Sequence, residues 1–90
     1  MPTIIMNAKL EKPYDDWVKA FDEHQSLRTA VGIKDMYRGH ELSDPNTIHV
    51  VMSVPSMEIM DTFMKENAEL IKNAGHNLES TQVTVCTDQS

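Results

Sequence analysis

The stretch TIHVVMSV, residues 47–54, carries the strongest secondary-structure signal in the chain. It is rich in β-branched residues, which favour strands, and Pro55 follows it and has no N–H to donate to a strand ladder. The preceding residues 43–46, SDPN, are typical of a turn and separate this strand from a more polar one over residues 34–42. The middle of the chain is therefore predicted to be a β-hairpin.

One further strand and one helix are predicted on each side of this hairpin. Residues 3–10 alternate between apolar and other side chains and form the first strand, and residues 82–87, QVTVCT, form the last. Helices are predicted from residue 15 to about residue 29 and over residues 57–74, with a glycine just beyond each. Asn67 interrupts the apolar face of the second helix; it either restarts the helix after a kink, as an internal cap, or contacts a ligand.

The order β-α-β-β-α-β predicts a single α+β domain over residues 1–90 with the ferredoxin-like arrangement, a four-stranded antiparallel sheet with two helices on one face. Both faces of the sheet contain large apolar residues, so the face without helices needs a cover. A second copy of the sheet is the natural cover, and we expect a homodimer packed through the sheet faces. The register is open: the uncovered face holds either Ile48, Val50, Met52 and Val54, or Ile5, Val51 and Cys86.

Composition excludes several classes of function. The 14 Asp and Glu residues outnumber the eight Lys and Arg residues, and the net charge of −6 disfavours binding to nucleic acid or to an anionic membrane. The N-terminus lacks the pattern of a signal peptide or a membrane span, so we expect a cytoplasmic protein. One cysteine forms no internal disulfide, and the four histidines have no metal-ligand spacing. We therefore expect no metal and no cofactor.

His24 and Arg28 are the strongest functional candidates, because both fall near the apolar stripe of the first helix, close to Trp17 and Phe21. In the structural interpretation, Arg28 extends past the helix end and His24 is a core histidine bonded to the backbone. In the functional interpretation, the two line a ligand-binding cavity between helix and sheet, with Trp17, Phe21 and methionines as its walls. A neutral His24 could there accept a proton, while Arg28 could bind a carboxylate or enolate oxygen.

Other polar and soft side chains are secondary candidates. Asn7 and Tyr37 on the strands are candidate ligand contacts, and His76, beyond the second helix, is expected to be an exposed loop residue. His49 is placed opposite the Ile48 set, where it could face a dimer partner. The methionines that could line a cavity for a flat organic ligand are Met36, Met52, Met57, Met60 and Met64.

The segments DDWVKAFDEHQSLRTAVGI (15–33), DPNTIHVVMSV (44–54) and LIKNAG (70–75) resemble those of the dimeric α+β barrel superfamily. The spacing W-x-x-x-F-D-x-H-x-x-x-R is most similar to small uncharacterised bacterial proteins within it. This resemblance implies a cavity between the helices and the sheet of each protomer. The superfamily includes cofactor-independent monooxygenases, haem-degrading monooxygenases, polyketide cyclases, muconolactone isomerases and stress-response dimers.

The haem-degrading branch is not expected, because only one of its three site residues is matched. Asn7 fits the asparagine of the first strand, but the tryptophan and histidine positions fall near Val54 and Asn73. Three hypotheses remain. The first is a homodimer that binds a small organic ligand; the second is a cofactor-independent monooxygenase or cyclase/isomerase with His24 as base and Arg28 stabilising an oxyanion. The third is a non-catalytic interaction or stress-response dimer.

Overall fold

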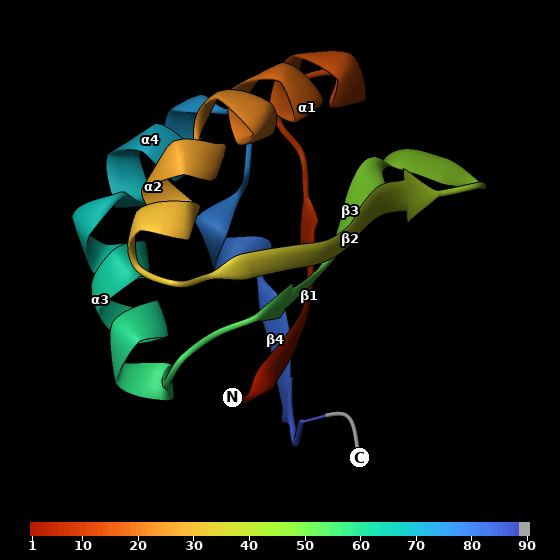
Figure 1. Cartoon of the computed structure of the whole chain (residues 1–90). Coiled ribbons are helices and arrows are strands. Elements are labelled where there is room, and N and C mark those ends of the chain that lie inside the picture. Colours follow the sequence, from red (N-terminus) through yellow and green to blue (C-terminus); the bar gives the residue numbers. More distant parts are fainter. Residues whose placement is uncertain (89–90) are drawn as a thin grey trace.

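A computed structural model describes residues 1–88 of the chain and confirms the ferredoxin-like α+β fold (Figure 1). The four strands form one antiparallel sheet in the order β2-β3-β1-β4. The helices all lie on one side of this sheet (Figure 1). In chain order the elements are β1 Thr3–Lys9, α1 Tyr14–Glu23, α2 Gln25–Ala30, β2 Lys34–Glu41, β3 Asp44–Ser53, α3 Met57–Glu66, α4 Ala68–Asn73, the 3₁₀ turn η1 Leu78–Ser80 and β4 Gln82–Cys86.

Each of the two predicted helices is interrupted once, so the helical layer contains four short helices. The break between α3 and α4 falls at Asn67, where a kink was expected. Its side chain does not cap α4, however, because Nδ2 donates to the carbonyl of Phe63 at 2.9 Å. The break between α1 and α2 at His24 was not predicted. The Asn67 side chain thus bonds a carbonyl at the end of α3 and does not cap the start of α4, so the internal-cap interpretation is wrong in that detail.

The register between β1 and β3 decides which side of the sheet faces the helices. Ile4 pairs with Met52 and Met6 with Val50, and all four side chains are buried. The alternating set that includes Ile5 lies on the opposite, open face, where Ile5 is 41% exposed. The open face therefore carries the second of the two predicted sets, and the buried core is Ile4, Met6, Ala8, Leu10, Trp17, Ile33, Ile48, Val50, Met52, Val54, Met60 and Ala74.

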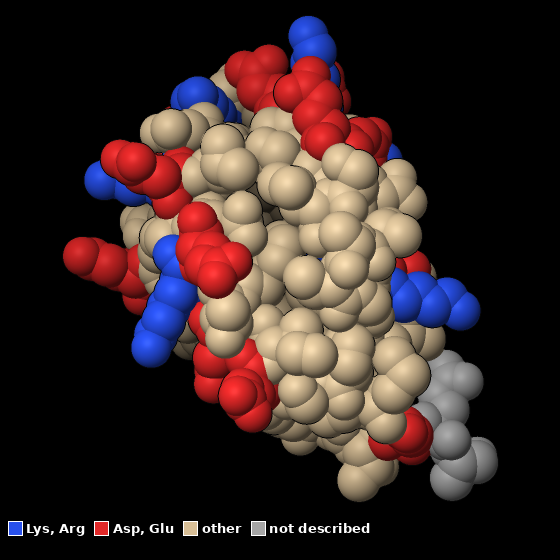
Figure 2. All heavy atoms as spheres, turned by 60° about the vertical axis from the view of Figure 1, so that its left-hand side comes forward, with Lys and Arg blue, Asp and Glu red and all other residues tan. Residues whose placement is uncertain are grey.

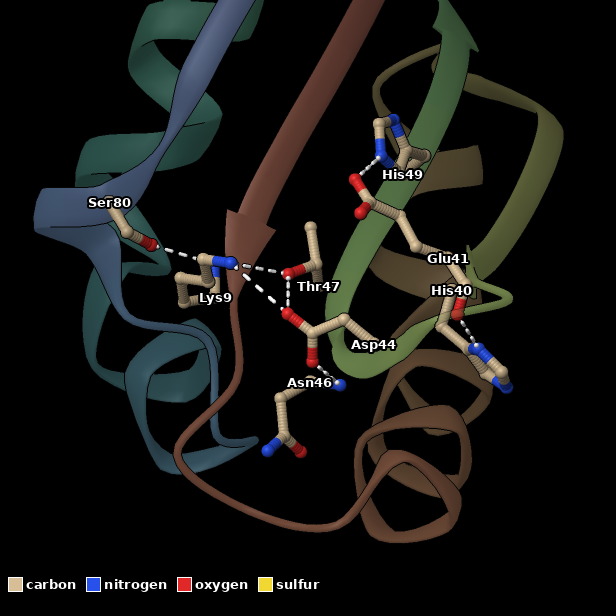
Figure 3. Close-up of polar contacts among 8 residues, drawn as sticks. All are labelled: Lys9, His40, Glu41, Asp44, Asn46, Thr47, His49 and Ser80. Carbon is tan, nitrogen blue, oxygen red and sulfur yellow. Dashed lines mark hydrogen bonds and ion pairs between the residues drawn. The ribbon is translucent and has the colours of Figure 1, made fainter.

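The hairpin between β2 and β3 turns two residues earlier than the sequence suggests. Glu41 pairs directly with Asp44, so the turn is Leu42-Ser43 and β3 already contains Pro45. The Asp44 carboxylate accepts from the Thr47 hydroxyl at 2.6 Å and from the Asn46 amide at 3.0 Å (Figure 3). Such side-chain bonds to nearby residues are typical of turns, which explains why residues 43–46 look like a turn in the sequence. Both bonds lower the pKa of Asp44, and the bond from Thr47 does so most strongly.

Lys9 connects the end of β1 to the elements beside it. Its ammonium group donates to Thr47 Oγ1 at 2.6 Å and to Asp44 Oδ2 at 3.2 Å, and its backbone amide donates to Ser80 Oγ at 2.8 Å (Figure 3). One residue therefore joins β1, β3 and the η1 turn. Within the described part of the chain, no helix is long and apolar enough to cross a membrane.

Candidate functional site

A cavity lies between the helices and the covered face of the sheet. The volume of this cavity, counted as the space that the centre of a water-sized sphere can occupy, is about 60 Å³. Figure 2 brings the helix side of the molecule forward and shows uncharged side chains over the middle of the surface, with Asp and Glu gathered along its left and upper edges. The apolar wall consists of Met6, Trp17, Phe21, Leu27, Val50, Met52, Met60, Phe63, Met64, Leu70, Ile71 and Ala74. Only four polar side chains interrupt it: His24, Arg28, Asn67 and His76.

Arg28 is buried at the C-terminal end of α2 and is held by two other elements. Its Nε and Nη2 donate to the two carboxylate oxygens of Asp35 in β2, at 2.9 and 3.0 Å. Nη2 also donates to the carbonyl of Phe21 at 2.9 Å, and the guanidinium carbon lies 3.7 Å from the centre of the Phe21 ring. Arg28 is only 5% exposed, so the predicted extension past the helix end is wrong. Its partner is Asp35 and not His24.

This pairing has two consequences for the cavity. The bidentate contact with Asp35 neutralises the guanidinium charge, so an anionic ligand gains less from Arg28 than from an isolated arginine. Nη1 takes part in none of these contacts and keeps its two N–H groups for another acceptor. Arg28 is therefore primarily a structural residue that presents one nitrogen to further partners.

His24 marks the break between α1 and α2 and lines the cavity. Its backbone amide donates to the carbonyls of Ala20 and Phe21, and its carbonyl accepts from the amides of Leu27 and Arg28. The half-buried imidazole makes no hydrogen bond with residues 1–88. The backbone of His24 is thus held by both helices, while the nitrogen atoms of its imidazole are left available.

His76 was predicted to be exposed, and this prediction is wrong, because the side chain is only 5% exposed and lines the cavity. Gly75 adopts φ +105°, and its carbonyl accepts from the Glu11 amide at 2.6 Å, which turns the chain back onto the end of β1. His76 then pairs with Leu10, and its Nε2 lies 2.6 Å from Thr81 Oγ1. Burial lowers the pKa of His76 below 6.5. Only the glycine gave a local signal for this turn.

The other predicted site residues divide between the two faces of the sheet. Trp17 and Phe21 line the cavity, with ring centres 4.9 Å apart. Asn7 pairs with His49 and Tyr37 with Val51, which places both on the open face, away from the cavity. The sheet thus separates Asn7 and Tyr37 from the other four candidates, and whether any of the six binds a ligand stays a prediction.

The remaining candidates follow the same division. Four methionines line the cavity, whereas Met57 packs against the core and Met36 is 44% exposed. Cys86, a member of the set that includes Ile5, lies half-buried on the open face. In residues 1–88, no three His, Cys, Asp or Glu side chains gather in an arrangement that could hold a metal ion. The cavity-lining methionines are Met6, Met52, Met60 and Met64.

Comparison with solved structures places this chain among proteins of the same ferredoxin-like α+β fold. It is similar to an antibiotic biosynthesis monooxygenase (TM-score 0.69, 14% identity, 100% of both chains) and to an uncharacterized NIPSNAP domain protein from Burkholderia xenovorans (TM-score 0.65, 10% identity, 100% and 96%). It is also similar to SnoaB, a cofactor-independent oxygenase from Streptomyces nogalater (TM-score 0.68, 7% identity, 99% and 93%). At these identities the likeness establishes the fold alone.

The family is established by the sequence itself. Residues 1–88 match the family described as "Domain of unknown function (DUF3764)", and the chain belongs to it. No curated protein matches the chain closely enough to indicate homology. The predicted resemblance to an uncharacterised family with a ferredoxin-like α+β fold is therefore confirmed, whereas the dimer stays a prediction.

Replacing Arg28 with alanine should destabilise the fold strongly, because the Asp35 carboxylate and the Phe21 carbonyl then lose a buried partner. We expect a loss of about 3 kcal/mol in the free energy of unfolding, measured by urea denaturation. Arg38→Ala is the matched control, since its ion pair with Asp22 is far more exposed, and it should cost no more than about 1 kcal/mol. Equal losses in the two variants would contradict a structural role for Arg28.

The lowered pKa of His76 makes stability depend on pH. The unfolded chain, in which the pKa is near 6.5, takes up the proton first as the pH falls, so protonation favours unfolding. The stability that neutral His76 contributes is fully present above about pH 6.5 and declines below it. The pKa of Asp44 is lowered from 3.8, so Asp44 changes the stability only in more acidic solution. Between about pH 7.5 and about pH 5.5, urea denaturation should show a smaller decline for His76→Gln than for the unmodified chain. If the free energy of unfolding declined equally in both proteins, His76 would not be the source of this pH dependence.

Proposed function

We propose that the cavity between the helices and the sheet binds a small, largely apolar, uncharged organic molecule. The observation that carries this proposal is the composition of the wall, in which aromatic and methionine side chains surround a few polar groups. Such a wall is typical of sites that select a ligand by shape and orient it with a few hydrogen bonds.

The charge of the ligand follows from the pairing of Arg28. Since Asp35 already neutralises the guanidinium group, a carboxylate in the cavity would be a buried anion without a matching free cation. A carbonyl or hydroxyl oxygen needs only a hydrogen bond, which Nη1 of Arg28 or the His24 imidazole can supply. The earlier expectation of a carboxylate ligand is thus replaced by one of a neutral ligand.

The size of the cavity requires the wall to yield when a ligand enters. An engineered cavity of about 150 Å³ holds benzene in another protein, and the volume here is about 60 Å³. Four of the lining residues are methionines, whose three rotatable bonds let a wall adapt to an occupant. Two helix breaks, at His24 and Asn67, also border the cavity and interrupt the helical hydrogen bonding there.

A catalytic version of this proposal, a cofactor-independent monooxygenase or cyclase/isomerase, uses His24 as a base. Because Asp35 neutralises the guanidinium charge, Arg28 Nη1 would stabilise a transient oxyanion only as a hydrogen-bond donor. The unengaged imidazole of His24 and the shared fold with the oxygenase from Streptomyces nogalater support the catalytic version. The alternative of a non-catalytic interaction or stress-response dimer is supported by the structural engagement of Arg28.

The open face of the sheet supports the proposal of a homodimer packed sheet to sheet. Ile5 and Tyr37 are 41% and 55% exposed there, and they lie beside Val51 and Thr84 in the neighbouring strands. A chain of this size buries only about 60% of its surface when it folds alone, so covering this face adds stability that the monomer lacks. His49 also lies on this face, and its Nε2 is hydrogen-bonded to Glu41 Oε2 at 2.7 Å (Figure 3).

Small aromatic probes test the cavity. Toluene and phenol are expected to shift the methyl resonances of Met6, Met52, Met60 and Met64 in NMR spectra, with no effect on exposed Met36. Benzoate should bind at least about tenfold more weakly, because no free cation compensates its charge. Shifts of Met36 equal to those of the four lining methionines would show non-specific binding, and the absence of any shift would contradict the proposed site.

Sedimentation equilibrium tests the dimer. The unmodified chain should sediment at twice 10.2 kDa at micromolar concentration, and Ile5→Lys should shift it to the monomer because it places a charge on the apolar open face. Val31→Lys is the matched control, since Val31 is equally exposed, at 41%, but lies at the end of α2 and does not line the cavity. A dimer that survives Ile5→Lys and dissociates with Val31→Lys would contradict an interface on the open face.

A further inference from the structure

We infer that His76 makes a further hydrogen bond to a ligand in the cavity, through Nδ1, with Thr81 holding the imidazole in place. This inference rests on the proposed function and deepens it, because it names a contact outside the His24–Arg28 region. The side chain comes from the turn after α4 and is buried against the end of β1.

The hydrogen bonding of His76 leaves one ring nitrogen available. Nε2 lies 2.6 Å from Thr81 Oγ1, whereas Nδ1 has no partner in the described residues. Throughout residues 1–88, every side-chain nitrogen or oxygen atom that is fully shielded has a hydrogen-bond partner. Nδ1, which has no partner, is therefore not fully shielded, although the side chain is only 5% exposed. Because His76 lines the cavity, we assign this open volume to the cavity.

Burial also sets the kind of group that His76 can recognise. A shielded imidazole is held in its neutral form, so it offers a hydrogen bond and not a charge. If Nε2 donates to Thr81, Nδ1 accepts; if the Thr81 hydroxyl donates to Nε2, Nδ1 carries the proton. A hydroxyl group both donates and accepts, so it matches His76 in either tautomer, and a neutral hydroxylated molecule is the class that this end of the cavity fits.

His76 and Arg28 approach the cavity from opposite ends of the sheet. Asp35, which holds Arg28, pairs with Met52 and through it with Ile4, whereas His76 pairs with Leu10. Ile4 and Leu10 are separated by about 20 Å along the strand direction, at about 3.3 Å per residue. His76 therefore adds a second polar contact and does not merely extend the one made by Arg28.

Phenol and toluene, which have nearly the same shape, provide the test on the full chain. We expect phenol to shift the imidazole Nδ1 resonance of His76 in ¹H–¹⁵N spectra, and toluene to move the cavity methionine methyls without shifting Nδ1. Thr81→Val keeps the shape of the side chain and removes its hydroxyl. It should weaken phenol binding about fivefold, as expected for one lost hydrogen bond, and leave toluene binding unchanged.

His49→Gln is the control variant, because His49 lies on the open face and pairs with Glu41. It should leave the binding of both probes unchanged. Methionine methyls that respond to phenol while His76 Nδ1 stays unshifted would overturn the role of His76 and leave the cavity as a binding site. If neither probe moves the methyl resonances, the proposed function fails together with this inference.

Discussion

The Arg28–Asp35 ion pair is the interaction on which the arrangement of the helical layer depends. A guanidinium group buried this deeply requires a paired carboxylate, and Asp35 supplies both oxygens from the start of β2. The same guanidinium donates to the Phe21 carbonyl, which also accepts from the His24 amide at the end of α1. One side chain thus joins α1, α2 and β2 beside the break at His24, and it is one of the four polar side chains that line the cavity.

The two faces of the sheet divide the roles of the chain. On the covered face, Met6 and Val50 form part of the cavity floor, and the polar groups reach it from the helices and from the turn at His76. The open face instead carries Ile5 and Tyr37, and we propose that it is covered by a second copy of the chain. Because alternate residues of one strand point to opposite faces, a single strand such as β1 serves both purposes.

The strands and the core could be predicted because their signals are local. Alternation in β1 and β3 selects the two sets of side chains, but only the paired register decides which set meets the helices. Asn67 was recognisable as a polar interruption of an apolar face, and the chain does break there. Asn7 lies on the face opposite the cavity, since it directly follows Met6 in β1 and alternate residues of a strand point to opposite faces.

The contacts that define the site were not predictable, because they join residues through the fold. Nothing local distinguishes Asp35 from other acidic residues as the partner of Arg28, and the burial of His76 arises from pairing with Leu10 at the other end of the chain. Gly75 indicates a turn, but only the position of β1 determines that the turn buries a histidine. Contacts between residues distant in sequence therefore determine which polar groups face the cavity.

The most direct measurement of the central claim is native mass spectrometry of the gently purified protein. A ligand cavity in a homodimer predicts a species of two chains with a discrete additional mass, which is lost when the same sample is denatured. A monomer, or a dimer whose mass equals that of two bare chains, would contradict this account.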